Sequence, residues 1–139
     1  DGALPVVVWG PGEEALARAV VDASEGGAVL SPPLGLRFLA ALLRRAALFV
    51  GADTGPMHLA WAVGCPVIAL FGPTDPRLNA PLGSDHVVLR RGRSMDDLPV
   101  QDVVEAAESV LRRPPAASRQ AVPLFPRAAL SRFAGGAAR

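Results

Sequence analysis

The sequence predicts a Rossmann-like α/β fold, in which a parallel sheet carries helices on both faces. The first observation behind this prediction is that short apolar runs alternate with helical patterns, with short connections between them. The second is that these runs are continuously apolar rather than alternating, as in strands buried on both faces of a sheet.

Two strand–helix pairs are predicted in the first third of the chain. Residues 4–9, LPVVVW, form a continuous apolar run ended by Gly10, which predicts a strand buried on both faces. Residues 13–24 predict a helix, with acids in the first turn where the helix dipole favours them. Residues 28–30 predict a brief strand, and residues 36–47 predict an amphipathic helix. The apolar faces expected for these two helices are Leu16, Ala19, Val20 and Ala23, and Leu36, Leu39, Ala40 and Leu43.

The same alternation continues to residue 111. The sequence predicts strands at 48–52, 66–71 and 86–90, a short helix at 56–63 closed by Gly64, a long loop at 72–85, and an amphipathic helix at 100–111. The predicted domain therefore spans residues 1–113. The Pro-, Ala- and Arg-rich residues 114–139 are predicted to be a tail that is poorly ordered or docked on a partner.

Composition narrows the possible partners. The net charge of +1 gives no electrostatic case for nucleic acid or an anionic membrane surface. All 14 basic residues are Arg, which excludes lysine-dependent chemistry within this chain. The single Cys65 favours a reducing, cytoplasmic compartment, and we expect neither a transmembrane helix nor a signal peptide. The abrupt start at DGALPVVVW suggests a piece of a longer chain.

The tripeptide Asp53-Thr54-Gly55 has two possible interpretations. Aspartic proteases place the same tripeptide at a turn between strands of an all-β domain. Here it follows a predicted strand and is followed at once by a predicted helix, so we reject the protease interpretation. In open α/β sheets, ligands bind beyond the carboxyl ends of the strands, which is where Asp53 stands.

The start of the helix after Asp53 suits an anion. Pro56 fits a first turn, and the unpaired N–H groups of Gly55, Met57 and His58 are predicted to point outward, where the helix dipole attracts negative charge. Gly55 lets a phosphate approach the backbone, and the Thr54 hydroxyl and His58 could add hydrogen bonds. The duller alternatives are that Asp53 and Thr54 only cap the helix, that His58 is structural, and that Met57 packs in the core. A second loop, FGPTDP, also follows a predicted strand and should emerge on the same edge of the sheet.

The stretch VGADTGPMHLAWAVGCPVIALFGPTDP resembles the signature of the family 9 glycosyltransferases, the ADP-heptose:lipopolysaccharide heptosyltransferases. That signature has a D-T/S-G-x-x-H helix start followed by a P-V-φ-A-L-F-G-P-T strand and loop. The flanking segments agree, so the resemblance extends from about Leu4 to Leu111. It implies the C-terminal half of an inverting GT-B enzyme, which binds a nucleotide-sugar donor without a metal or other cofactor.

The resemblance also implies roles for individual residues. Asp53 would bind donor sugar hydroxyls, while the backbone of residues 54–57 (Thr54, Gly55, Pro56, Met57) would hold the diphosphate, with His58 supporting the turn. Glu13 or Glu14 would bind the ribose hydroxyls, and Leu34 would lie against adenine; the alternatives are an acid favoured by a helix N-terminus and a loop residue tucked into the core. A second cleft loop would contain Gly72, Pro73 and Thr74. No catalytic residue is expected here, because the general base belongs to the family's N-terminal domain.

Departures from the family pattern keep other interpretations open. No Lys neutralises the phosphates, SPPLG replaces a loop that often carries Lys or Thr, and RLNAP replaces a Gly-Pro pair. A non-catalytic nucleotide-binding or interaction module is the main alternative, and half of a sugar-nucleotide epimerase is a weaker one. In the family interpretation, the partners are an ADP-sugar and a lipopolysaccharide-type acceptor at the inner face of the bacterial inner membrane, reached only through the full-length enzyme.

Overall fold

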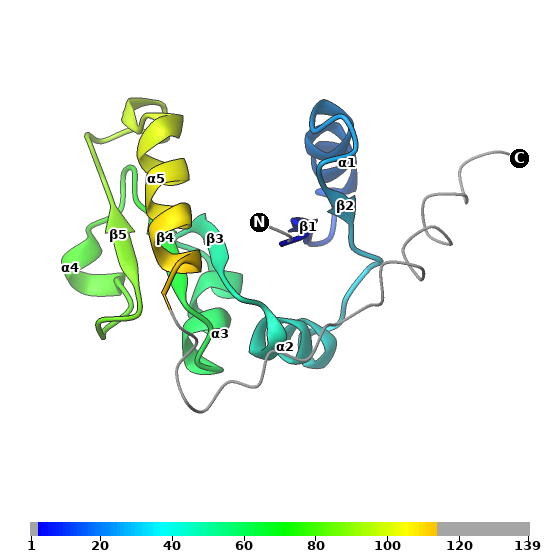
Figure 1. The fold of residues 1–139 in the computed structure, drawn as a ribbon, viewed down its shortest axis with the longest axis horizontal. Coiled ribbons are helices and arrows are strands. Elements are labelled where there is room, and N and C mark those ends of the chain that lie inside the picture. The colour runs from blue at the N-terminus through cyan, green and yellow to red at the C-terminus, as the bar shows by residue number, and fades with distance from the viewer. Residues whose placement is uncertain (1–2, 114–139) are drawn as a thin grey trace, which may run out of the picture. The chain divides into compact units, whose positions relative to one another are not determined.

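The computed structural model describes residues 3–113, and the predicted tail at residues 114–139 lies outside them (Figure 1). The chain divides into two compact units, Asp1–Ala41 and Leu42–Arg139. Each unit has its own parallel sheet, with α1 packed on the first and two helices packed on the second, which is the α/β class that the sequence predicts.

The first unit contains a two-stranded sheet. Strand β1 (Val6–Val7) pairs in parallel with β2 (Val29–Leu30), and helix α1 (Glu14–Ala23) packs on both strands. The predicted strand at 4–9, buried on both faces, is therefore wrong in length and in burial. Val6 remains 40% exposed, because α1 is the helix that covers these strands within the described part of the unit.

The apolar faces predicted for the first two helices are only partly buried. In α1, Ala17 is buried while Leu16 is 71% exposed. Helix α2 (Leu36–Arg45) runs from the first unit into the second, and it buries Leu43 but leaves Leu36 exposed. The helical periodicity located both helices, but it did not identify the side chains that they bury.

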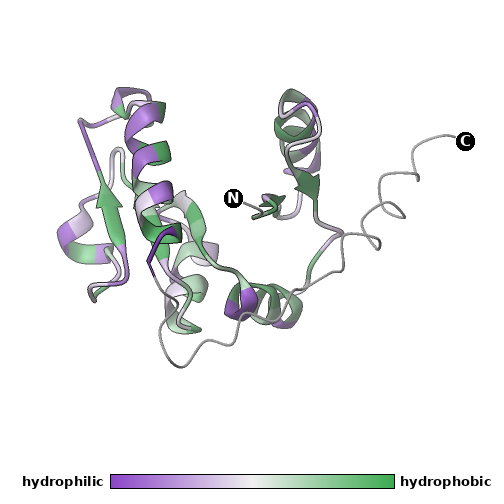
Figure 2. Cartoon of the chain, viewed as in Figure 1, coloured by the Kyte–Doolittle hydropathy of each residue, from purple (hydrophilic) through white to green (hydrophobic). Residues whose placement is uncertain are grey.

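The second unit is built on a three-stranded parallel sheet in the order β3 (Phe49–Ala52), β4 (Val67–Leu70), β5 (Val87–Leu89). The central strand β4 begins with three fully buried residues, and the hydropathy colouring of Figure 2 shows the apolar character of β4 and β5. In the register, Ala52 lies beside Leu70 and Leu70 beside Leu89. The three strands therefore end together at one edge of the sheet.

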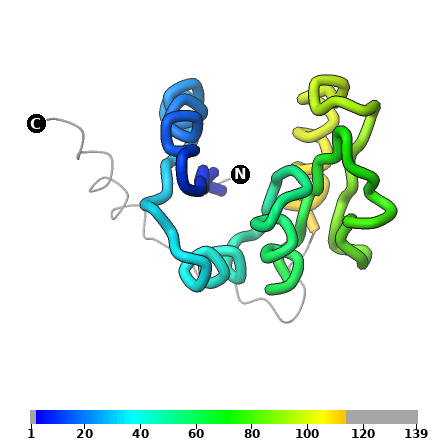
Figure 3. The backbone as a smooth tube through the Cα atoms, turned by 180° about the vertical axis from the view of Figure 1, so that it is seen from behind, coloured from blue at the N-terminus to red at the C-terminus, as the bar shows by residue number. Residues whose placement is uncertain are grey.

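Helices cover both faces of this sheet. Helix α3 (Gly55–Ala62) packs on β3 and β4, and α5 (Val100–Leu111) packs on β4 and β5. Figure 1 shows α5 in front of the strands, and the reverse view in Figure 3 shows α3 in front of them. Met57 and Ala60 of α3 and Val110 of α5 are buried. The predicted arrangement of helices on both faces is confirmed for this unit.

Helix α3 ends as the sequence predicts. Gly64 has a φ of +79°, a left-handed conformation that glycine adopts without strain. Its N–H donates to the carbonyl of Trp61 (2.9 Å), and the N–H of Cys65 donates to the carbonyl of Ala60 (2.8 Å). These two bonds form a Schellman motif, which satisfies carbonyls at the helix end and turns the chain into β4.

The second unit also contains two short elements that the sequence analysis missed. The predicted loop at 72–85 contains helix α4 (Pro76–Asn79), which begins because the Asp75 carboxylate accepts from the N–H of Arg77 and Pro76 suits a first turn. Before α5, Ser94 and Asp97 form a capping box around the 3₁₀ helix η1 (Met95–Asp97). Among residues 3–113, no helix has both the length and the apolar character needed to cross a bilayer.

Candidate functional site

The candidate site in the second unit lies at the carboxyl edge of its sheet. Ala52 and Leu70 are register partners at the ends of β3 and β4, so the chain leaves the sheet at Asp53 and at Phe71 side by side. The structure therefore places the two predicted loops, 53–58 and 71–76, next to each other at one edge. This is the edge of an open parallel sheet where ligands bind.

The first turn of α3 presents fewer free amides than the sequence analysis predicts. The N–H groups of Met57 and His58 both donate to the carbonyl of Thr54, at 3.1 and 3.3 Å, so the prediction that they point outward unpaired is wrong. These are the bonds that start the helix, and Pro56 has no N–H to offer. Within residues 3–113, the amides of Thr54 and Gly55 donate no hydrogen bond. The space beside Gly55 is open, because a Cβ built there meets no atom within 4 Å.

The side chains of this turn do not cap the helix. Thr54 precedes α3, but its hydroxyl donates backward to the carbonyl of Ala52 at 3.2 Å, and α3 has no side-chain cap. The capping alternative for Asp53 and Thr54 is therefore not what the structure shows. Met57 is fully buried, as the packing alternative for this residue predicts. Within residues 3–113, the unpaired donors of the turn are therefore the backbone N–H groups of Thr54 and Gly55.

Asp53 is the most highly connected side chain of the site. Its carboxylate is only 8% exposed and accepts from Nε2 of His58 at 3.1 Å and from Nδ2 of Asn79 at 2.9 Å. Burial raises the pKa of Asp53, but the hydrogen bonds from Asn79, Thr74 and His58, together with the charge of His58, outweigh burial and hold the pKa below its ordinary value. Asp53 thus stays ionised and joins the start of α3 to the loop after β4.

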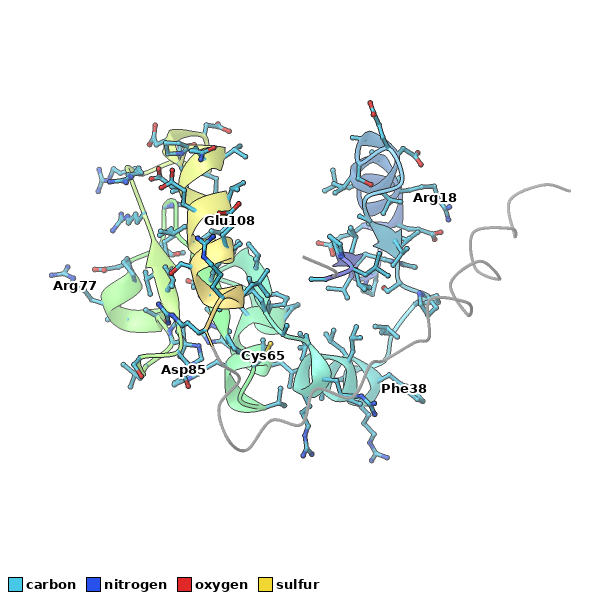
Figure 4. All side chains as sticks on the ribbon, viewed as in Figure 1. Arg18, Phe38, Cys65, Arg77, Asp85 and Glu108 are labelled. Atoms are coloured by element: carbon cyan, nitrogen blue, oxygen red, sulfur yellow. The ribbon has the colours of Figure 1, made fainter. Side chains whose placement is uncertain are left out.

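The second cleft loop has a buried end and an exposed end. Gly72 is buried, and a Cβ built on it would lie 2.9 Å from the backbone nitrogen of Met95, so the close approach of residues 94–95 requires glycine there. Pro73 and Thr74 are exposed. The side-chain and backbone hydrogen bonds from Arg77 lower the pKa of Asp75 to about 2, and Figure 4 shows Arg77 projecting away from α4.

A groove lies at the matching edge of the sheet in the first unit. Val7 and Leu30 are register partners, so the segments that follow β1 and β2 leave the sheet together. Between them is a groove of about 240 Å³ lined by Trp9, Gly10, Pro11, Pro33, Leu34 and Gly35. The indole N–H of Trp9 donates to the carbonyl of Ser31 at 2.9 Å, which fixes the ring plane. The structure thus puts Leu34 in an apolar groove rather than in the core.

Glu13 and Glu14 make different contacts in the structure. Oε2 of Glu13 accepts from the N–H of Gly10 at 2.8 Å, so this carboxylate lies at the turn that lines the groove. Glu14 instead pairs with Arg18 at 2.7 Å, one helical turn along α1. Both acids begin the helix, as the dipole predicts, but only Glu13 is held beside the groove. Glu13 and Leu34 lie in the first unit, whereas Asp53–His58 and Gly72–Thr74 lie in the second.

Three residues of these two edges were missed by the sequence analysis. Asn79 lies in a segment without periodicity, and nothing in the sequence links it to Asp53, 26 residues earlier. Trp9 could have been found, because it ends a predicted strand at the edge where ligands bind. Ser31 is 95% buried and its hydroxyl has no hydrogen-bond partner among residues 3–113, which no sequence signal reveals. No group of three His, Cys, Asp or Glu side chains in this part of the chain could hold a metal ion.

Comparisons with known proteins indicate the family of the chain. The family "Glycosyltransferase family 9 (heptosyltransferase)" matches residues 4–107. The chain is 34% identical to lipopolysaccharide heptosyltransferase 3 of Escherichia coli K12 over 138 residues, covering 84% of this chain and 40% of that protein. It therefore spans about two fifths of the length of that relative.

Solved structures of this family are similar to the chain. The structure of E. coli heptosyltransferase WaaC with ADP is similar, with a TM-score of 0.69, 29% identity, and coverage of 78% of this chain and 34% of that one. A glycosyl transferase family 9 structure from Veillonella parvula has a TM-score of 0.72 at 27% identity, covering 79% of this chain and 37% of that one. The likeness thus covers most of the described residues and about a third of each solved chain.

Proposed function

The chain belongs to glycosyltransferase family 9, and from that membership we propose that it is the donor-binding half of an inverting glycosyltransferase. In this proposal the full-length enzyme transfers heptose from an ADP-sugar to a lipopolysaccharide-type acceptor. The relatives named as lipopolysaccharide heptosyltransferases and the similar structure with ADP support this choice of donor and acceptor. The proposed location is the cytoplasm, at the inner face of the inner membrane.

The observation that carries the proposal is the pair of adjacent free amides at the start of α3. Thr54 and Gly55 leave their N–H groups unbonded within residues 3–113, at the carboxyl edge of a parallel sheet and beside open space. The helix dipole adds the equivalent of about half a positive charge at this end. Two amides and a helix end suit a diphosphate, whose oxygens only accept hydrogen bonds.

The same groups would act on the leaving group. When the acceptor hydroxyl attacks the anomeric carbon, the bond to the diphosphate breaks and negative charge grows on its oxygen. A fixed donor aimed at such a charge typically contributes about 3 kcal/mol to the transition state, roughly a hundredfold in rate. We propose that the start of α3 performs this role and that the transfer requires no metal. The general base is proposed to come from the N-terminal domain of the full-length enzyme, so this chain supplies no catalytic residue.

The groove in the first unit is the proposed nucleoside site. Leu34 and Trp9 give it apolar walls suited to a flat base, and the ring of Trp9 is held by Ser31. One oxygen of Glu13 is tied to Gly10, and the other accepts no hydrogen bond within the described residues. A carboxylate can accept two hydrogen bonds from a vicinal diol, which makes Glu13 rather than Glu14 the proposed ribose ligand.

Calorimetry and a transfer assay test the two halves of the proposal separately. The chain titrated with ADP and with ADP-heptose should bind both weakly, and with the same affinity in the presence of EDTA. The chain alone should transfer no heptose. Absence of any nucleotide binding would contradict the donor site, whereas transfer by the chain alone would contradict the assignment of the base to another domain.

A second candidate function is a non-catalytic nucleotide-binding module derived from the same fold. Two observations favour it: the chain has no Lys to neutralise a diphosphate, and α3 offers two free amides instead of the predicted three. The full-length gene product distinguishes the candidates. Binding of ADP-heptose with transfer supports the enzyme, and binding without transfer supports the module.

A further inference from the structure

Each oxygen of the Asp53 carboxylate is already held by one donor of its own protein. A carboxylate has two oxygens with about four acceptor positions. Nε2 of His58 binds Oδ1 and Nδ2 of Asn79 binds Oδ2, so acceptor positions remain for another donor. Because both oxygens are held, the orientation of the carboxylate sets the directions from which another donor can approach.

Asn79 is the donor that reaches Asp53 from farthest along the chain. Its Nδ2 lies 2.9 Å from Oδ2 of Asp53, 26 residues away. The atom facing the carboxylate must be the amide nitrogen, because a carboxylate only accepts hydrogen bonds. His58 holds the other oxygen, Oδ1, so each oxygen is fixed by a different element.

The segment that carries Asn79 is capped at its start and is anchored to α3 beyond its end. At the start of α4, Asp75 accepts from the backbone N–H of Arg77 at 3.0 Å. Beyond α4, the indole N–H of Trp61 in α3 donates to the carbonyl of Leu82 at 3.2 Å. Asn79 therefore acts from an anchored segment, and its side chain transmits the position of α4 to Asp53.

We propose that Asn79 is a positioning residue that orients the Asp53 carboxylate so that a remaining acceptor position receives one hydroxyl of the donor sugar. The inference rests on the proposed function and adds a residue that neither the helix start nor the second cleft loop includes. Its consequence is selective: Asn79 should matter for a ligand that carries the sugar and not for the nucleotide alone.

The experiment compares ADP-heptose with ADP in calorimetric titrations of the chain and two variants. Asn79→Leu removes the donor, and Asn79→Asp removes it and places a second negative charge against Asp53. Both variants should lower the affinity for ADP-heptose about tenfold or more, with the larger loss for Asn79→Asp. The affinity for ADP should change less than about twofold. The matched control is Leu78→Ala, which alters a neighbouring side chain of α4 that is 82% exposed and should affect neither ligand.

A second measurement reads Asp53 directly. The pKa of the Asp53 carboxyl, followed by carbon NMR without ligand, should rise in Asn79→Leu and stay unchanged in Leu78→Ala. Asn79 is the only asparagine of the chain, so its side-chain amide gives a single asparagine signal that should move as Asp53 titrates.

The outcomes separate this inference from the proposed function. Equal losses for ADP and ADP-heptose would show that Asn79 has only a structural role, and unchanged ADP-heptose affinity would overturn the inference while leaving the donor site intact. Failure of the unaltered chain to bind either ligand would overturn the proposed function and this inference with it.

Discussion

Nε2 of His58 lies 3.1 Å from Oδ1 of Asp53, so the side chain one turn into α3 is joined to a residue two positions before the helix. The bond fixes the direction of the carboxylate and of the imidazole together. It also accounts for the spacing of the D-T-G-x-x-H motif, because five residues bring the two side chains together across the helix start. The structural and functional alternatives for His58 are therefore compatible, since the residue shapes the turn that the diphosphate would meet.

This connection predicts a pH-dependent contribution of Asp53 to stability. The pKa of Asp53 is lower in the folded chain than its ordinary value of 3.8, so folding favours the ionised form. The stabilisation is fully present above the unfolded pKa and is lost as the pH falls through the lower folded value. Asp53→Asn should lower the free energy of unfolding by about 1–3 kcal/mol near neutral pH, because an amide cannot accept from every donor that the carboxylate now satisfies.

Urea unfolding across the acid range checks this prediction. The difference between the unaltered chain and Asp53→Asn should shrink as the pH falls below about 4. Asp85→Asn is the control, because Asp85 is exposed and accepts no hydrogen bond within residues 3–113. A difference that stays constant with pH would show that the carboxylate is not stabilised by its partners.

Gly72 is predicted to be essential for packing rather than for binding. A methyl group at this position would sit 2.9 Å from the nitrogen of Met95 and 3.1 Å from the carbonyl carbon of Ser94, and these backbone atoms cannot move without displacing η1. Gly72→Ala should lower the free energy of unfolding by about 1–3 kcal/mol, as overpacked sites do. Thermal or chemical unfolding measures this, and an unchanged midpoint would mean that the 94–95 segment adjusts freely.

Gly55 should show the opposite behaviour. Open space surrounds it and its φ is not in the left-handed region, so Gly55→Ala should change stability by less than about 1 kcal/mol. The same methyl group would stand where a phosphate approaches the amides of Thr54 and Gly55. Affinity for ADP should therefore fall about tenfold in calorimetry. Gly72→Ala and Gly55→Ala are matched controls, and an unchanged ADP affinity in Gly55→Ala would argue against a diphosphate at the start of α3.

The fold was predictable where local signals and burial agree. The β4 run was apolar throughout and its first three residues are fully buried, and Gly64 marked the end of α3 by the conformation it adopts. The prediction for residues 4–9 was wrong. A continuous apolar run predicts a strand covered on both faces, whereas Val6 stays partly exposed in the described unit. Helix α4 was missed although Asp75-Pro76 is a standard helix start, because four residues are too short for helical periodicity.

The site was predictable in place but not in detail. The rule that ligands bind beyond the strand ends located Asp53 and Gly55 from the order of elements alone. The hydrogen bonds of the first turn depend on how tightly the chain winds after Thr54, which the sequence does not specify. The bond from Asn79 to Asp53 depends on how the chain returns between β4 and β5, and no local pattern reports such a contact.

Leu34 should contribute to the binding of the nucleoside but not of the phosphates. Leu34→Ala removes part of an apolar wall of the groove, so ADP should bind several-fold more weakly, since burying a Leu side chain contributes about 1.5–3 kcal/mol at most. Ribose 5-phosphate, which has no base, should be unaffected. The control is Leu36→Ala, whose side chain is 73% exposed and lies outside the groove lining. Equal effects of the two variants would place the base elsewhere.

Glu13 and Glu14 are adjacent in sequence, and the structure predicts different effects for them. The Glu13 carboxylate is held against Gly10 at the groove with one oxygen still available, whereas Glu14 pairs with Arg18 on the exposed side of α1. Glu13→Gln should weaken ADP about tenfold, because a carboxylate accepts hydrogen bonds from hydroxyls more strongly than an amide does. Glu14→Gln should leave the affinity for ADP unchanged and cost at most about 0.5 kcal/mol of stability, as the loss of an exposed i,i+4 pair does.

The 2′,3′-dideoxyribose analogue of ADP is the control ligand for this prediction. Glu13→Gln should not alter the affinity for a nucleotide without ribose hydroxyls. A loss of ADP affinity in Glu14→Gln instead would show that Glu14, and not Glu13, binds the ribose.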